Sequence, residues 1–197
     1  QVPANKTNTG DVDSSFGGTP LAGVTFTAYD VTEHYLALRK GGQTAEEATQ
    51  AVQKDAVDKA PSYANQVGQE VTKGADDTVT FSNLASKDGY KDKVYLFVET
   101  NSPTDITQKA DPIVLALPIY KTVSASEINT NIHVYPKNKK STAITKDLND
   151  KSKTALEVTL AGGTKVYNAT FGQTFGYQLQ IAVPWNIADK STFNVVD

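Results

Sequence analysis

Residues 132–138 read Ile-His-Val-Tyr-Pro-Lys-Asn, and this stretch is the most informative part of the chain for its fold. Side chains along a β-strand alternate between its two faces. One face of this segment therefore carries the aliphatic residues together with Asn138, and the other carries Lys137. The pattern predicts a strand that turns Asn138 toward a core and Lys137 toward solvent, so that the two neighbours can take part in different chemistry.

The same alternation recurs along the first two thirds of the chain between turn-forming residues. It predicts strands over residues 23–29, 78–84, 93–100, 113–120 and 131–137. A capping-box pattern at Thr44 and Glu47 predicts a helix that runs to residue 59, and a shorter helix is predicted over residues 32–39. Strands at this spacing are typical of a β-sandwich, with the helices inserted in one long connection.

A second series of strands follows a polar linker that begins at Lys139. The predicted strands cover residues 143–148, 156–160, 175–183 and 192–197. Four strands are too few to close a sandwich, and the last of them would be an unpaired edge strand. We therefore expect a first domain over residues 1–139 and the first part of a second domain over residues 140–197. The opening strand of the first sheet is expected to precede residue 1.

Composition excludes several classes of function. The 197 residues carry a formal net charge of −3 at pH 7, and no basic patch suggests a nucleic-acid partner. No apolar run is long enough to span a membrane. Cysteine is absent, so neither a disulfide nor a thiolate metal site can form. His34 and His133 lack the spacing of metal ligands, and no phosphate loop or catalytic triad pattern occurs. We expect no metal and no cofactor.

Three ionisable residues take positions where the alternation calls for an apolar side chain: Glu99, Lys146 and Asp197. Burial favours the neutral forms of carboxyl and amine groups. A neutral amine is a nucleophile and a protonated carboxyl can polarise an amide, so an asparagine between them could form an amide cross-link with loss of ammonia. Other interpretations stay open, namely partly exposed strand ends, a buried ion pair, or inward charges that protect a sheet edge.

Two motifs resemble those of sortase-assembled pilins of Gram-positive bacteria. Residues 132–137 resemble the pilin motif, whose core is Val-x-Val-Tyr-Pro-Lys, and residues 95–103 resemble the E-box, Tyr-x-Leu-x-Glu-Thr-x-Ala-Pro. The chain departs from the family pattern at Ile128 (often tryptophan), Ile132 (valine), Phe97 (leucine) and Ser102 (alanine). The order and separation of the two motifs make a Spa-type backbone, or shaft, pilin the best interpretation. The resemblance implies tandem immunoglobulin-like sandwiches of the Cna type.

The resemblance implies that Lys137 accepts the C-terminal threonine of another subunit from a sortase, so that subunits join head to tail. Lys139 and Lys140 are nearby alternatives without the Tyr-Pro context. The implied partners are neighbouring pilin subunits and the pilus sortase, and a host extracellular-matrix or mucus component is left open. The implied location is a secreted, cell-wall-anchored pilus on the cell surface.

The family also implies Lys–Asn isopeptide bonds inside its domains, assisted by an acid. In the first domain Glu99 corresponds to the acid and Asn138 to the asparagine. Lys6 is the only early lysine, in a poor strand context, so the partner of Asn138 is expected before residue 1. In the second domain Lys146 and Asp197 correspond to the lysine and the acid, with the asparagine expected beyond residue 197.

The sequence thus favours a structural subunit that is a substrate of a sortase and is not itself an enzyme, apart from autocatalytic cross-linking. A basal or adhesive pilin of the same system is the first alternative, although a tip adhesin needs no acceptor such as Lys137. A secreted carbohydrate-binding β-sandwich is the second alternative, from a different class. It predicts a cleft with convergent polar groups, and the sequence contains no such cluster.

Overall fold

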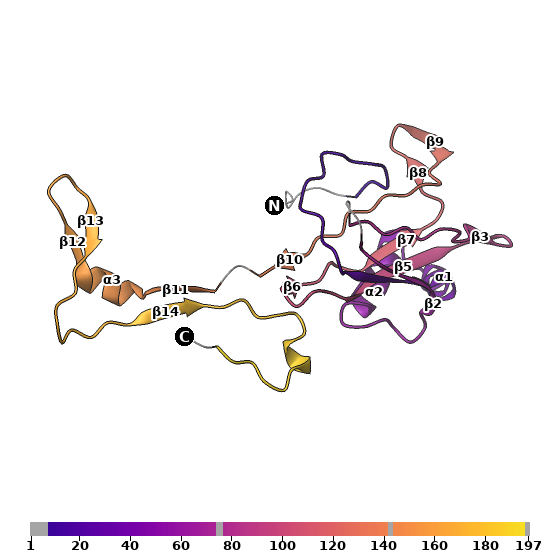
Figure 1. Cartoon of the computed structure of the whole chain (residues 1–197). Coiled ribbons are helices and arrows are strands. Elements are labelled where there is room, and N and C mark those ends of the chain that lie inside the picture. Colours follow the sequence, from indigo (N-terminus) through magenta and orange to yellow (C-terminus); the bar gives the residue numbers. More distant parts are fainter. Residues whose placement is uncertain (1–7, 74–76, 142–143, 196–197) are drawn as a thin grey trace.

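A four-stranded antiparallel sheet organises the N-terminal part of the molecule (Figure 1). The computed structural model describes residues 8–73, 77–141 and 144–195. The strand order is β2-β1-β5-β7. These strands are β1 (Thr25–Asp30), β2 (Asn65–Val71), β5 (Val94–Asn101) and β7 (Ile113–Ala116). The central pair combines β1, where apolar and polar residues alternate, with β5, which begins with five consecutive apolar residues.

Two helices fill the connection between β1 and β2, as predicted. They are α1 (Thr32–Lys40) and α2 (Ala45–Asp55). Thr44 and Glu47 form the predicted capping box, with Glu47 N donating to Thr44 Oγ1 at 3.1 Å and Thr44 N donating to Glu47 Oε2 at 2.7 Å. Ala48 and Val52 are fully buried, so α2 packs its narrow apolar stripe onto the sheet. The helix ends four residues earlier than predicted.

The core lies between these helices and one face of the sheet. Val94, Leu96 and Val98 of β5 point into it, together with buried residues of β1, α1 and α2. On the opposite face of β5, the ring of Phe97 lies 5.3 Å from that of Phe81, and Glu99 is buried. The strand predicted over residues 93–100 is therefore confirmed, and Glu99 is buried on the face of β5 opposite the helices.

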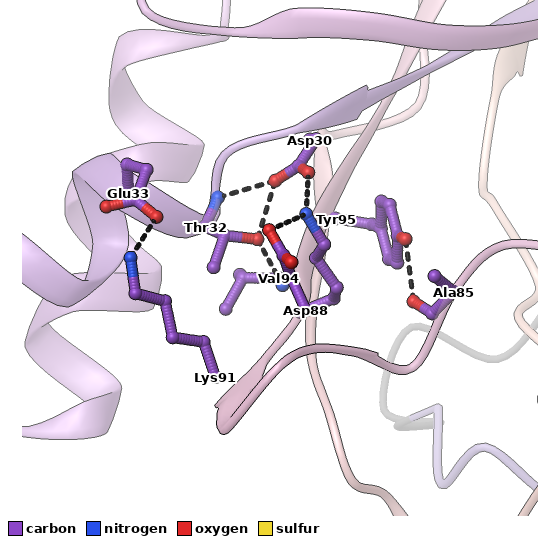
Figure 2. Close-up of polar contacts among 9 residues, drawn as sticks. Asp30, Thr32, Glu33, Ala85, Asp88, Lys91, Val94 and Tyr95 are labelled. Carbon is purple, nitrogen blue, oxygen red and sulfur yellow. Dashed lines mark hydrogen bonds and ion pairs between the residues drawn. The ribbon is translucent and has the colours of Figure 1, made fainter.

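A polar network fastens the end of β1 to β5 (Figure 2). Lys93 Nζ lies 2.7 Å from Asp30 Oδ2, and Thr32 donates from its backbone N to Asp30 Oδ1 at 2.9 Å. Val94 N in turn donates to Thr32 Oγ1 at 3.0 Å. Burial raises the pKa of Asp30, but the hydrogen bonds from Lys93 and Thr32 outweigh it and hold the pKa below its ordinary value of 3.8.

This network predicts a pH-dependent contribution to stability. Because the folded-state pKa of Asp30 is lowered, its stabilising effect is present above the unfolded value and is lost as the pH falls through the folded value. We expect Asp30→Asn to lower the free energy of unfolding at neutral pH by about 1–2 kcal/mol and to flatten its acid dependence. Urea unfolding at several pH values measures both. Asp88→Asn is the matched control, because Asp88 is exposed and lies 3.7 Å from Lys93.

Short strand pairs complete the N-terminal part. Their members are β3 (Lys87–Asp88), β4 (Lys91–Asp92), β6 (Ile106–Gln108), β8 (Tyr120–Lys121), β9 (Ser124–Ile128) and β10 (Lys139–Lys140). β3 pairs with β4, β8 with β9, and β6 with β10, all antiparallel. The pairing of β6 with β10 matters for function, because it holds the residues just before Lys139 against the residues just after Gln108.

The C-terminal part is built from two further strand pairs and short helices. Strand β11 (Thr145–Leu148) pairs with β14 (Tyr177–Gln180), and β12 (Glu157–Thr159) pairs with β13 (Lys165–Tyr167). The helix α3 (Asp150–Leu156) joins β11 to β12, and the short helix η1 (Ile187–Asp189) follows β14 (Figure 1). Beside η1, Trp185 N donates to Ile106 O at 2.9 Å, so this part also contacts β6.

The predicted mainly-β class with inserted helices is confirmed. Three predicted strands are wrong. Residues 78–84 form only one isolated bridge, from Thr78 to Lys73, and residues 192–195 form no strand. Residues 131–137 form a single bridge, at His133, because Pro136 cannot donate and the segment bonds to the N-terminal loop. No helix in the described ranges is long and apolar enough to cross a membrane.

Candidate functional site

A buried carboxylate at the end of β5 gathers four hydrogen bonds. Glu99 is 3% exposed, and Asn138 Nδ2 lies 2.6 Å from its Oε1 and 2.8 Å from its Oε2. Ala110 N donates to Glu99 Oε2 at 2.9 Å, and the Ser102 hydroxyl donates to Oε1. The structure thus brings together Glu99 and Asn138, the two residues that the family resemblance assigns to one site, and the buried carboxylate is fully satisfied.

Local structure explains how Asn138 reaches Glu99. Asn138 directly precedes β10, and β10 pairs with β6 so that Lys139 lies opposite Gln108. This pairing directs the half-buried Asn138 side chain toward the end of β5, where Glu99 lies. The Glu99–Asn138 contact spans 39 residues of sequence, so it depends on the pairing of β6 with β10 and on no local turn.

A desolvated amine lies in the same neighbourhood. Lys109 follows β6, its Nζ donates to Thr100 O at 3.2 Å, and the Nζ lies 3.5 Å from the ring centroid of Trp185. Burial lowers the pKa of the Lys109 amine, while the negative charges of Glu99 and Asp189 oppose that shift. Nothing in the local sequence distinguishes Lys109, so no pattern predicts its burial.

The arrangement of Glu99 and Asn138 defines what the pair can do chemically. The carboxylate accepts from Nδ2, which is the nitrogen that would leave if an amine attacked the carboxamide. A carboxylate in this position can take up or deliver a proton at that nitrogen. The site thus holds an oriented amide and an acid–base group in a buried setting.

Lys137 lies next to Asn138 in the chain but in a different environment. It is half-buried rather than fully solvent-facing, and its Nζ lies 5.3 Å from the ring centroid of Phe16. A groove of about 480 Å³ begins beside it. The lining comes from residues 8–10, Gln53, residues 111–115, Ile119 and residues 134–137. Lys137 therefore lines this open groove, while Asn138 is engaged with Glu99.

The two neighbouring lysines of β10 differ from Lys137. Both Lys139 and Lys140 are exposed, and Lys140 Nζ lies 2.9 Å from Asp105 Oδ2. Neither lines the groove. Among these three lysines, Lys137 is therefore the one that lines the groove.

The second predicted cross-linking site takes a different form. Lys146 is exposed, with its Nζ 4.6 Å from the ring centroid of Tyr177, so its predicted burial is wrong. The reason is that β11 pairs only with β14 among the described residues, and β14 is itself exposed. Asp197 and Lys6 lie outside the described residues.

The described ranges contain no group of three side chains arranged to hold a metal ion. Phe16 was not among the residues predicted from the sequence; it is 3% exposed and packs on Tyr135 of the motif segment. It is the single aromatic residue among the first 20, and that isolation in a polar stretch is a signal that could have identified it.

Comparison with known proteins identifies one matching family. The model of the family described as Gram-positive pilin subunit D1, N-terminal domain, matches residues 1–139. A comparison with functionally curated proteins found no match.

Three solved pilin structures are similar to the chain. The SpaB basal pilin of Lactobacillus rhamnosus GG is 34% identical, with 50% of this chain and 74% of that chain covered and a TM-score of 0.44. The N-terminal domain of the shaft pilin SpaA of the same organism is 28% identical, with 70% and 84% covered and a TM-score of 0.46. The major pilin SpaA of Corynebacterium diphtheriae is 18% identical, with 74% and 32% covered and a TM-score of 0.47.

Proposed function

Because the chain belongs to the family of Gram-positive pilin subunits, we propose that Lys137 is the amine through which a pilus sortase joins it to a second subunit. Gram-positive pilins are structural components of pili on the cell surface, and this chain is one of them. The proposal makes the chain a covalently polymerised subunit of a wall-anchored pilus, with Lys137 as its reactive group.

The proposed joining reaction is an acyl transfer to an amine. The sortase carries the donor subunit as a thioester of its C-terminal threonine. Lys137 Nζ attacks the thioester carbonyl, the carbon–sulfur bond breaks, and an amide forms between the threonine and Nζ. The cysteine sulfur of the sortase leaves and recovers a proton, and the amine loses one. The chain itself supplies only the nucleophile.

One observation carries this proposal: two adjacent residues of the motif are divided between two environments. Asn138 is engaged by the buried Glu99, whereas Lys137 lines a groove of about 480 Å³. An acyl-enzyme can approach an amine in an open groove, and it cannot approach one inside a packed core. This supports Lys137 as the acceptor over any buried lysine.

Purified protein, the cognate pilus sortase and a peptide that carries the sortase recognition sequence provide the test. We expect a single peptide to become attached per protein chain. Attachment at several lysines, or no attachment, contradicts the proposal. With the full-length protein as both donor and acceptor, a shaft subunit gives a ladder of polymers, whereas a basal subunit gives one addition per pilus.

We further propose that Glu99 assists an internal isopeptide bond at Asn138. A lysine Nζ attacks Asn138 Cγ, the bond from Cγ to Nδ2 breaks, and Nδ2 leaves as ammonia after Glu99 passes it a proton from the amine. The four hydrogen bonds that fix the Glu99 carboxylate support this role. A comparable bond from Lys146, assisted by Asp197, stays a prediction.

Intact mass of the protein in its full natural length tests the internal bond. Each bond lowers the mass by about 17 Da, the mass of the released ammonia. Peptide mapping then identifies the lysine, and the two candidates within this chain are Lys6 and Lys109. An unmodified mass contradicts the proposal, and a cross-link that excludes Asn138 contradicts the assignment of the site.

A further inference from the structure

A segment of the N-terminal loop crosses the pilin motif, and we call residues 8–16 the strap. His133 N donates to Gly10 O at 2.8 Å, which forms an isolated antiparallel bridge. Tyr135 N donates to Asn8 Oδ1, also at 2.8 Å. The strap therefore supplies hydrogen-bond acceptors to the backbone N–H groups of the motif, a role that a neighbouring strand would otherwise fill.

The strap is itself anchored to the hairpin of β8 and β9. Thr122 N donates to Asp11 Oδ2 at 2.9 Å, and Asn129 Nδ2 donates to Gly10 O at 2.8 Å and to Asp11 Oδ1 at 3.1 Å. Gly10 has a φ of +88°, and a Cβ atom there would lie 3.3 Å from Ile119 Cγ2. These contacts fix the path of the strap at its middle.

The strap ends in an aromatic contact beside Lys137. The ring of Phe16 is 3% exposed and stacks on the ring of Tyr135, with centroids 4.5 Å apart and planes inclined by 16°. Asp13 N donates to the Tyr135 hydroxyl oxygen at 2.8 Å. Lys137 Nζ lies 5.3 Å from the Phe16 centroid, within the range of a cation–π contact. Two aromatic rings from distant parts of the sequence thus form a fixed platform beside the amine.

We propose that Phe16 is a positioning residue for Lys137, which holds the lysine side chain in the groove where it attacks the sortase acyl-enzyme. This inference rests on the proposed role of Lys137 as the acceptor. Phe16 takes no part in the bond changes, and it acts by restricting where the amine lies.

The physical reason is the flexibility of lysine. A solvated lysine samples many rotamers, and few of them place the amine for attack. A ring that contacts the side chain removes part of this freedom before the acyl-enzyme arrives. Loss of such a contact is expected to lower the joining rate at saturating acceptor by about 3- to 30-fold, with a smaller change in the acceptor KM.

The experiment compares Phe16→Leu, Phe16→Tyr and Phe81→Leu in the full-length protein. The assay is sortase-catalysed attachment of the recognition peptide, followed as a function of acceptor concentration. Leucine keeps apolar bulk and removes the ring, and tyrosine restores the ring. Phe81→Leu is the matched control, because the Phe81 ring packs against Phe97 of β5 at a centroid distance of 5.3 Å, away from the contact between Phe16 and Tyr135. We expect a reduced kcat for Phe16→Leu, recovery with tyrosine, and a normal kcat for the control.

A second measurement separates a displaced lysine from an unfolded protein. Limiting acetylation followed by peptide mapping gives the labelling of Lys137 relative to the exposed Lys139. Labelling of Lys93, whose side chain is 17% exposed in its ion pair with Asp30, reports loss of the fold. We expect Phe16→Leu to raise the ratio of Lys137 labelling to Lys139 labelling by about 2-fold or more, since the ring no longer covers the Lys137 side chain. The labelling of Lys93 is expected to stay unchanged.

The outcomes distinguish this inference from the proposed function. If Lys137→Arg abolishes attachment but Phe16→Leu reacts at the normal rate with a normal labelling ratio, the positioning role is overturned and the acceptor stands. If Lys137→Arg still accepts the peptide, the proposed acceptor itself is wrong. If Phe16→Leu unfolds, the variant Gly10→Ala replaces it in the test, because the added Cβ displaces the strap without changing Phe16. Gly10→Ala must then show the loss of kcat while Lys93 stays protected from acetylation. A normal kcat for that variant overturns the inference.

Discussion

Replacing Lys137 by arginine is expected to abolish the ladder of covalent polymers in cells that assemble the pilus. Arginine keeps the positive charge and can keep the contact with the Phe16 ring, which lies 5.3 Å from Lys137 Nζ. Its guanidinium group stays protonated and is not a nucleophile at neutral pH. The change therefore removes the chemistry of the side chain while disturbing its surroundings little. The measurement is immunoblotting of wall extracts for high-mass species.

The neighbouring lysines provide the matched controls for this experiment. Lys139→Arg and Lys140→Arg change the same residue type within three positions, on exposed side chains that do not line the groove. Both variants are expected to give ladders like those of the unmodified protein. Loss of the ladder in one of these variants, with normal assembly by Lys137→Arg, would move the acceptor to β10.

Replacing Glu99 by alanine is expected to lower the free energy of unfolding by about 2–4 kcal/mol, because buried donors lose their acceptor. Ala110 N and the Asn138 amide both donate to this carboxylate, whose residue is 3% exposed. Water reaches this site poorly, so the donors cannot recover their hydrogen bonds at full strength. Urea unfolding measures the loss.

Two further variants separate the structural and the chemical roles of Glu99. Glu33→Ala is the control for a surface glutamate, since the Glu33 side chain is 76% exposed beside Lys91, and it is expected to change stability by about 0.5 kcal/mol or less. Glu99→Gln keeps the shape of the side chain but cannot transfer a proton as a carboxyl does. We expect it to leave the internal bond unformed, with an intact mass about 17 Da above the mass calculated for the cross-linked form of the same variant. A cross-linked Glu99→Gln protein would contradict the assisting role.

The features that the sequence predicted well are those encoded by strong local patterns. Strand β5 begins with five consecutive apolar residues, so the strand follows directly from the sequence, and the burial of Glu99 follows from its place on the same face as Tyr95 and Phe97. Helix α2 begins where its capping box places it. The meeting of Glu99 with Asn138 was implied by the family resemblance, and the pairing of β6 with β10 accounts for it.

The features that the sequence did not predict depend on contacts between distant segments. Strand β2 lies at the sheet edge with few apolar residues, so no alternation marks it. The motif segment alternates like a strand, but its backbone bonds to the strap through Gly10 and Asn8, which no local pattern reveals. Lys146 fits the pattern of an inward residue, yet no described layer covers β11 and the side chain is exposed. Alternation gives the face of a residue, and only the neighbouring layer decides whether that face is buried.

Tandem mass spectrometry of the sortase-joined product tests the central claim most directly. After proteolysis, the acceptor lysine appears as a branched peptide that contains both the motif segment and the donor's terminal threonine. We predict that the branch lies on Lys137 Nζ and that Lys139 and Lys140 are unmodified. Asn138 is expected to take no part in the bond to the donor threonine. A branch located on any other lysine would contradict the account.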